Sequence, residues 1–287
     1  MSDVSRLIDR AETLLQRLEA WLPAAPVATD WSATAWRWRR QNGRGVLQAV
    51  TQPHRIGLSD LRGIAHQKAL LVRNTRQFLQ GLPANNVLLT GARGTGKSSL
   101  VKALLHDFCA DGLRLIEVDK ADLTDLAEIT ALLQGRAERF IIYCDDLSFE
   151  ADEPGYKALK VALDGSIAAA ADNLLIYATS NRRHLMPEYM HENLATQYTG
   201  EEIRPGETAE EKISLSERFG LWLSFYPFDQ DAYLSIVRHW LKRHGIARLT
   251  AAARREALQF AVQRGSRSGR VAAQFARDWA GRQQLRS

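Results

Sequence analysis

An apolar segment of this chain runs directly into a glycine-rich turn and then into a helical pattern, in the sequence NNVLLTGARGTGKSSLVKALL. The turn, Gly91 to Ser98, matches the spacing G-x-x-x-x-G-K-[ST]. Glycines at these positions let successive backbone N–H groups point inward, and the first turn of the following helix adds positive potential. The strand, loop and helix in this order therefore predict a phosphate-binding loop.

The candidate phosphate-binding residues are the loop itself and the residue after it: Gly91, Ala92, Arg93, Gly94, Thr95, Gly96, Lys97, Ser98 and Ser99. In an ATP site of this kind, the Lys97 ammonium is expected to reach the β- and γ-phosphates, and the Ser98 hydroxyl is expected to bind Mg²⁺. A glycine-rich turn with a purely structural use is the alternative interpretation.

A second apolar segment ends in two carboxylates, in the sequence FIIYCDD from Phe140 to Asp146. A buried strand beside the phosphate loop would place Asp145 where it can hold the Mg²⁺ shell, and Asp146 where it can polarise the attacking water. Glu150 is an alternative base. Two acidic residues that only cap a strand-to-loop turn are the simpler interpretation.

Apolar strand patterns and helical patterns alternate through the middle of the chain, which is typical of a parallel sheet covered by helices on both faces. After Pro227 the pattern is helical to the end, with breaks near Gly245 and at Gly265 to Gly269. We expect an N-terminal extension (1–50), an αβα core (51–227) and a helical lid (228–287). The predicted strands are Asn86–Thr90, Arg114–Val118, Phe140–Cys144, Leu174–Thr179 and Leu221–Phe225.

Four further segments have recognisable patterns. Asp3 to Leu22 and Leu58 to Leu79 show helical spacing of apolar residues. Trp31 to Arg44 reads as a basic, aromatic hairpin or loop. Met186 to Lys212 is polar, with seven Glu, and is too long for an ordinary connection, so we expect it to be functional or mobile.

Composition and charge narrow the possible cellular locations and partners of the protein. The two cysteines, Cys109 and Cys144, form neither a disulfide framework nor a metal site, which favours a reducing, cytoplasmic location. The N-terminus has no apolar core of the kind that a signal peptide needs, and no window is apolar enough to span a membrane. From Ile236 to Ser287 there are twelve Lys or Arg against two acidic residues, whereas the whole chain carries only +5. This asymmetry suggests a basic face for an anionic partner, or a lid with solvated arginines.

These features together resemble the AAA+ ATPases and, more narrowly, an uncharacterised bacterial family of AAA-type ATP-binding proteins. The resemblance covers about residues 50 to 287. It is carried by GLSDLRGIAHQKALLVRNTRQFLQG, GARGTGKSSLVKALL, FIIYCDDLSFE, ATSNRRHL and LSERFGLWLSFYP. It implies a P-loop α/β core with a helical lid, ATP and Mg²⁺ as ligands, hydrolysis of ATP, and assembly into a homo-oligomer.

The resemblance also implies roles for residues outside the two motifs. Leu61 to Ile64 would wall the adenine, and Asn181 would be the polar sensor between the acidic residues and the γ-phosphate. Arg218, in Ser-Glu-Arg-Phe, would be the arginine finger that reaches the site of a neighbouring subunit. Arg270 would contact the γ-phosphate from the lid, with Arg267 as its rival. The simpler interpretations are ordinary helix packing for Leu61 to Ile64, a plain turn residue for Asn181 and a solvated surface arginine for Arg218.

Two departures from the family pattern bear on function. Most AAA+ relatives carry Glu where this chain has Asp146, so hydrolysis is predicted less firmly than binding. The segment from Val118 to Phe140 contains no aromatic-hydrophobic-Gly triplet, the pore loop of protein-threading machines, which argues against an unfoldase.

Three functions remain open from the sequence. The first is an ATP-driven switch or motor of the initiator and helicase-loader kind, whose lid and Trp31–Arg44 segment bind nucleic acid, because arginine neutralises phosphates and tryptophan stacks on bases. Tryptophans that anchor a small extension on the core are the alternative to that binding role. The second is a protein-remodelling or regulatory ATPase with an unknown protein client. The third is a nucleotide-binding scaffold with little turnover, as Asp146 suggests.

Overall fold

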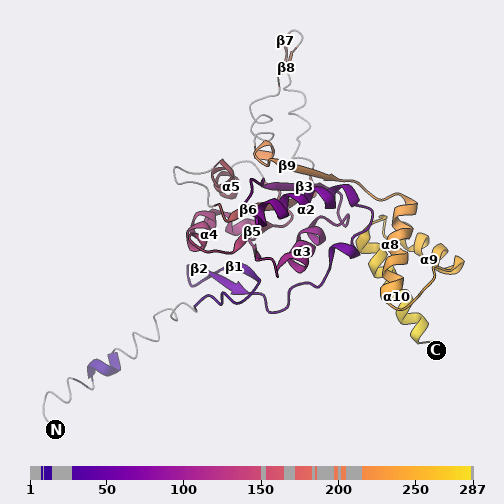
Figure 1. Cartoon of the computed structure of the whole chain (residues 1–287), viewed down its shortest axis with the longest axis horizontal. Helices are drawn as coiled ribbons and strands as arrows, with labels where there is room; N and C mark the ends of the chain where they lie inside the picture. Colours follow the sequence, from indigo (N-terminus) through magenta and orange to yellow (C-terminus); the bar gives the residue numbers. More distant parts are fainter. Residues whose placement is uncertain are drawn as a thin grey trace.

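The five predicted strands form adjacent strands of one sheet in the computed structural model, and each observed boundary lies within one residue of its prediction (Figure 1). The local patterns therefore predicted the strands correctly. The observed strands are β3 (Val87–Gly91), β4 (Leu113–Glu117), β5 (Arg139–Cys144), β6 (Leu174–Ser180) and β9 (Leu221–Phe225).

The structure describes residues 8, 10–14, 28–149, 153–164, 172–182, 185, 197–199, 202–204 and 215–285. Most of the N-terminal helix predicted over 3–22 lies outside this part of the chain, as does Glu150. The acidic segment 186–212 is described only at β7 (Gln197–Thr199) and β8 (Glu202–Arg204), which pair antiparallel. No helix among the described residues has the length and apolar character needed to cross a bilayer.

The strand order places the two predicted site motifs at the same edge of the sheet. The order is β2-β1-β4-β5-β6-β3-β9. Within it, β4, β5, β6, β3 and β9 all run parallel. Only β6 separates β3, which leads into the phosphate loop, from β5, which ends before Asp145. In open parallel sheets, ligands bind beyond the carboxyl ends of the strands, so this edge is the expected site.

The Trp–Arg segment is a hairpin that extends the sheet. Its strands, β1 (Ala35–Gln41) and β2 (Arg44–Ala49), pair antiparallel, and β1 adds parallel to β4. Trp36 and Trp38 are almost fully buried, and the Trp38 indole donates to Asp125 Oδ2 at 2.9 Å. The tryptophans of β1 therefore anchor the hairpin on the core, which is the alternative that the sequence left open, and their rings are not available to stack on bases.

The arginines of β1 pair with carboxylates of the core. Arg37 pairs with Glu117 at 2.7 Å, Arg39 with Asp119, and Arg40 with Asp125 at 2.5 Å. Three of the four arginines between Trp31 and Arg44 are therefore paired within the chain.

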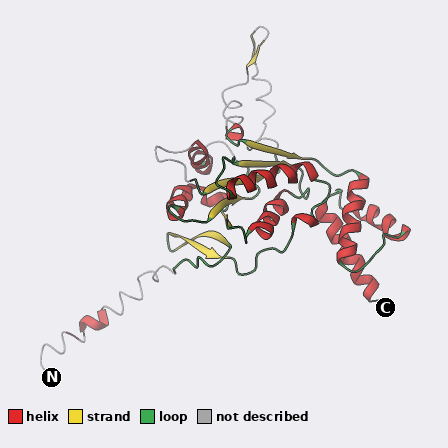
Figure 2. Ribbon diagram, in the orientation of Figure 1, coloured by secondary structure: helices red, strands yellow, loops and turns green. Residues whose placement is uncertain are grey.

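Helices cover both faces of the sheet, as the alternating pattern predicted (Figure 2). One apolar cluster joins the face of the sheet that carries Tyr143 to α2 (Ala65–Leu79) and α3 (Lys97–Phe108). The other cluster joins the opposite face to the 3₁₀ helix η2 (Lys120–Asp125), α4 (Leu126–Leu133), α5 (Pro154–Asp164) and the hairpin tryptophans.

The helix predicted from Leu58 begins seven residues later than expected. Leu58–Asp60 is a short 3₁₀ helix, η1, and α2 starts at Ala65. Between them Gly63 has a φ of 76°, a left-handed conformation that breaks the helix. The prediction was wrong here because the apolar spacing continues across the break. The break itself leaves residues 61–64 as a loop.

Three helices follow β9 and form the lid: α8 (Gln230–Arg243), α9 (Ala251–Gln263) and α10 (Gly269–Gln284). Each begins at a residue whose side chain caps the first turn, since Asp229, Thr250 and Ser268 each accept from a backbone N–H three residues on. The helices pack around Tyr233, Phe275 and other buried residues at the C-terminal end of the molecule (Figure 1).

Candidate functional site

The phosphate loop is shaped by glycines with positive φ. Gly91, Gly94 and Gly96 have φ values of 128°, 75° and 105°. A Cβ on Gly91 would lie 1.9 Å from the carbonyl oxygen of Phe225, at the end of β9. Glycine is therefore required at this position, both by the conformation and by the close approach of the neighbouring strand.

The first turn of the lid helix α10 contacts this loop directly. The Gly269 N–H donates to the Gly94 carbonyl at 2.8 Å, and a Cβ on Gly94 would lie 2.8 Å from Ser268. The lid and the loop thus meet through backbone atoms with no room for larger side chains. A change in the position of the lid would directly affect the loop.

Lys97 lies at the start of α3 and is almost fully buried. Its ammonium donates to the Gly91 carbonyl at 2.6 Å, to the Ala92 carbonyl at 2.9 Å and to Asn181 Oδ1 at 3.0 Å. Burial lowers the pKa of this ammonium, and the nearby charges of Arg93 and Arg270 lower it further, against the effect of the two aspartates. A buried ammonium with two further arginines near enough to lower its pKa favours a polyanionic ligand.

Ser98 and Asp145 meet across the site. The Ser98 hydroxyl donates to Asp145 Oδ1 at 2.7 Å, and the Thr179 hydroxyl donates to the same oxygen at 2.6 Å. Burial alone would raise the pKa of the Asp145 carboxyl, but these hydrogen bonds outweigh it and hold the pKa below its ordinary value. Asp145 is therefore an ionised carboxylate at neutral pH.

This pair fits a magnesium ion. A hydroxyl and a carboxylate are the hard oxygen ligands that Mg²⁺ takes from proteins, with phosphates and water completing its shell. Among the described residues there is no group of three or more His, Cys, Asp or Glu side chains that could hold a metal by themselves. The donor set suits an ion that arrives with a nucleotide.

Asn181 links the lysine to the second acidic residue. It accepts from Lys97 through Oδ1 and donates to Asp146 Oδ1 through its amide nitrogen. Asp146 has a φ of 54°, which Asp tolerates better than most residues, and lies 3.9 Å from Arg93 in an exposed ion pair. The structure thus joins three sequence-predicted residues, Lys97, Asn181 and Asp146, in one hydrogen-bonded chain.

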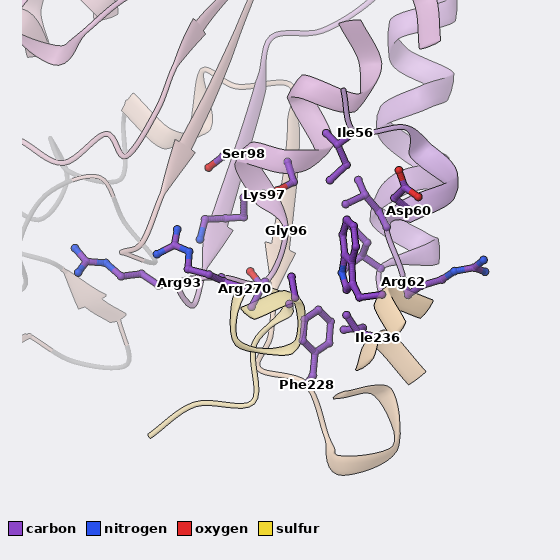
Figure 3. A pocket seen from close by; sticks show the side chains of 18 of the residues that line it. Ile56, Asp60, Arg62, Arg93, Gly96, Lys97, Ser98, Phe228, Ile236 and Arg270 are labelled. Carbon is purple, nitrogen blue, oxygen red and sulfur yellow. The ribbon is translucent and has the colours of Figure 1, made fainter. Parts of the chain in front are cut away.

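A cavity of about 690 Å³ lies beside the loop and has two chemically different ends. Figure 3 shows Arg93, Lys97, Ser98 and Arg270 at one end, and Ile56, Phe228 and Ile236 at the other. A cavity with one cationic and one apolar end matches a nucleotide, whose triphosphate is anionic and whose base is flat and largely apolar.

The apolar end comes from both the core and the lid. Leu61, Arg62 and Ile64, in the predicted base pocket, line the cavity, although Arg62 points outward in Figure 3. Facing them are Phe228 and, from α8, Ile236 and Trp240, which the sequence analysis did not single out. Lid helices show only amphipathic spacing, so no sequence signal separated the residues that face the cavity from those of the lid core.

The buried Asp60 carboxylate connects these two walls. It accepts from the Gly57 N–H at 3.1 Å, and it contacts His239 Nε2 at 3.1 Å and Arg243 Nη2 at 3.3 Å on α8. The 3₁₀ segment before the base pocket is therefore tied to the lid, beside the cavity.

The two candidate lid arginines lie on different cavities. Arg270 lines the main cavity, and in Figure 3 its side chain extends toward Lys97. Arg267 lines a second cavity of about 530 Å³, beside Pro227 and the end of α9. The geometry favours Arg270 over Arg267 as the lid residue that reaches a nucleotide.

Arg218 does not line the main cavity of its own chain. It follows a short helical turn, and its Nε lies 2.5 Å from Asp164 Oδ1 at the end of α5. The structure thus separates Arg218 from the other predicted site residues.

Comparisons with solved structures find distant similarity to RuvB proteins. The RuvB Holliday junction branch migration motor of Thermotoga maritima shares 13% identity, with a TM-score of 0.43, over 78% of this chain and 71% of that one. Its R170A variant matches with a TM-score of 0.44 at 13% identity, over 76% and 70% of the two chains. A comparison with curated proteins finds no match.

The fold class follows from this chain's own architecture. The β9-β3-β6-β5-β4 order, the loop between β3 and α3, and the helical lid are those of an AAA+ P-loop protein. Residues 31–283 match the family described as a protein of unknown function, DUF815. The chain therefore belongs to the DUF815 family, and its own strand order, loop and lid give it an AAA+ fold.

Proposed function

We propose that this protein binds ATP with Mg²⁺ and hydrolyses it to ADP and phosphate, to drive a conformational switch in a homo-oligomer. The observation that carries the proposal is the meeting of three parts in one cavity: the glycine-rich loop, the Ser98–Asp145 pair and the Lys97–Asn181–Asp146 chain. A structural loop has no need of a buried lysine beside two further cations.

The binding roles follow from the geometry. Backbone N–H groups of the loop and the Lys97 ammonium bind the phosphates, and Arg270 adds a charge from the lid. The adenine enters the apolar end between Ile64 and Trp240. Because the lid supplies both Arg270 and part of the base pocket, nucleotide binding favours one position of the lid.

The chemical step is an attack by water on the γ-phosphorus. The P–O bond to the β-phosphate breaks, ADP leaves, and the water proton passes to solvent or to the released phosphate. Asp146 accepts a hydrogen bond from the water, and Asn181 holds both the carboxylate and the Lys97 side of the site in place. A magnesium ion held by Ser98 and Asp145 supplies charge neutralisation.

Asp145→Asn tests this assignment. The substitution keeps the shape of the side chain but removes the charge that holds the ion. We expect phosphate release to fall by about 100-fold or more, and ATP affinity to fall much less, because the loop and Lys97 still hold the phosphates. The measurements are steady-state phosphate release against Mg²⁺ concentration and equilibrium titration of ATP.

Asp111→Asn is the matched control, since Asp111 is exposed in the turn after α3. It should behave as the wild type does. If Asp145→Asn kept the wild-type dependence on Mg²⁺, Asp145 would not be the metal residue. If the wild-type protein bound ATP but released no phosphate with Mg²⁺ present, a nucleotide-binding scaffold would replace the ATPase.

Arg218 completes the proposed site from a neighbouring subunit. Its position away from the cavity of its own chain supports a role in trans, where a guanidinium stabilises charge on the transferring phosphoryl group. In this account the active enzyme is an oligomer, with each site built from two copies.

The lid favours a nucleic-acid partner for the switch. Its exposed side chains include many cations and few acidic residues: Arg238, Lys242, Arg243, Arg248, Arg254, Arg255, Arg264, Arg267 and Arg277 are all exposed. The burial of Trp36 and Trp38 removes the hairpin from this hypothesis, so it rests on the lid alone.

The double variant Arg254→Ala/Arg255→Ala on α9 tests the nucleic-acid hypothesis. If both residues contact phosphates, the slope of log affinity against log salt should shrink by about 1–2, because each lost phosphate contact removes roughly 0.7–0.9 from it. Fluorescence anisotropy with single- and double-stranded oligonucleotides measures this. Lys157→Ala/Lys160→Ala on α5 removes the same charge elsewhere and should leave the slope unchanged. An absence of salt-sensitive binding by the wild type would favour a protein client.

A further inference from the structure

The guanidinium of Arg218 is held by a carboxylate of its own chain. Arg218 Nε lies 2.5 Å from Asp164 Oδ1, and the Arg218 side chain is 24% exposed while that of Asp164 is 44% exposed. Asp164 lies on α5 and does not line the cavity. Its contact with Arg218 is a charge-assisted hydrogen bond, which is among the stronger and more directional contacts that side chains make.

The two segments that carry this pair are anchored in the same apolar cluster. Four side chains are buried in the cluster that covers the face of the sheet opposite Tyr143: Tyr156 and Leu159 of α5, and Leu215 and Phe219 on either side of Arg218. The backbone N–H groups of Arg218 and Phe219 close turns onto Leu215 and Ser216 at 3.3 Å. The Cα positions of Arg218 and Asp164 are therefore fixed relative to each other.

The same apolar cluster also extends to the nucleotide site of the same subunit. Phe149, three residues after Asp146, packs edge-on against Tyr156 with ring centroids 5.8 Å apart. The helix that ends at Asp164 is thus packed against the segment that follows the catalytic carboxylates.

We propose that Asp164 is the positioning residue of the arginine finger, and that by holding Nε it sets the direction in which the Arg218 guanidinium reaches the neighbouring subunit's γ-phosphate. This inference rests on the proposed function of Arg218 in trans. A long arginine side chain samples many rotamers, and a fixed Nε removes most of that freedom before the two subunits meet.

Asp164→Asn tests the positioning role, because it removes the charge and keeps the size of the side chain. We expect kcat to fall by about 10-fold to 100-fold, the usual consequence of a misplaced catalytic group. ATP affinity and the oligomer mass should stay within twofold of the wild type, because Asp164 does not line the nucleotide cavity. Asp164→Glu, which restores the charge, should recover a large part of the lost rate.

Asp278→Asn is the matched control. Asp278 is a similarly exposed aspartate that pairs with Arg282 at 3.0 Å on the lid, so its loss breaks a comparable ion pair far from Arg218. Its kcat should be unchanged. Thermal unfolding of each variant separates a loss of rate from a loss of fold.

Arg218→Ala and the double variant Arg218→Ala/Asp164→Asn separate the two levels of the proposal. If Asp164 acts only through Arg218, the double variant should be no slower than Arg218→Ala. A slow Arg218→Ala with a fully active Asp164→Asn would overturn the positioning role and leave the finger intact. Additive losses in the double variant would also overturn it. A fully active Arg218→Ala would overturn the finger itself.

Discussion

Lys97→Ala is expected to weaken ATP binding by at least about 100-fold. The ammonium makes charge-assisted contacts with the phosphates, each worth roughly 1.5–3 kcal/mol, and tenfold in affinity corresponds to about 1.4 kcal/mol. Lys97 also donates to Gly91, Ala92 and Asn181, so its loss loosens the loop and the sensor together. Equilibrium titration with ATP and Mg²⁺ measures the effect.

Lys157→Ala is the control for this variant, because Lys157 is an exposed lysine on α5 that does not line the cavity. It should bind ATP as the wild type does. If Lys97→Ala bound ATP within a few-fold of the wild type, while unfolding at a similar temperature, the assignment of the phosphate loop would be wrong.

Arg218→Ala is expected to slow turnover by about 1000-fold or more, and to leave the affinity for ATP nearly unchanged. Arginine fingers contribute this much to rate, and Arg218 does not line the cavity of its own chain. The measurements are single-turnover hydrolysis and ATP titration of the same preparation.

A mixture of two inactive variants decides whether Arg218 acts in trans. Arg218→Ala subunits keep an intact site, and Lys97→Ala subunits keep an intact finger. Where an Arg218→Ala site meets a neighbour that carries Arg218, hydrolysis should recover. Mixtures that co-assemble, as seen by native mass measurement, and yet recover no activity would contradict a role in trans.

The parts of the site that could be predicted from sequence are those with local causes. The phosphate loop, the strand that leads into Asp145, and the Asn181 turn each have their signal within about ten residues, and residues of all three segments line one cavity in the structure. Thr179, which donates to Asp145, belongs to the strand end that was singled out only for Asn181. Its role depends on the pairing of β6 with β5, which is a tertiary contact that the local sequence does not predict.

Other features depend on contacts that are distant in sequence. Nothing local distinguishes a tryptophan that stacks on a base from Trp38, which packs under η2 and donates to Asp125. The apolar wall formed by Ile236 and Trp240 needs the lid to fold back over the loop before it exists. The Arg218–Asp164 pair joins residues 54 positions apart, and no spacing rule predicts it.

The most direct test of the central claim is native mass measurement of the wild-type protein with Mg²⁺ and a slowly hydrolysed ATP analogue, beside Lys97→Ala under the same conditions. The account predicts an oligomer of the wild-type protein that carries bound analogue, and no bound analogue on Lys97→Ala. A wild-type protein that stays monomeric and gains no nucleotide mass at saturating analogue would contradict it. A monomer with bound analogue would support the nucleotide-binding site but contradict a catalytic site built from two subunits.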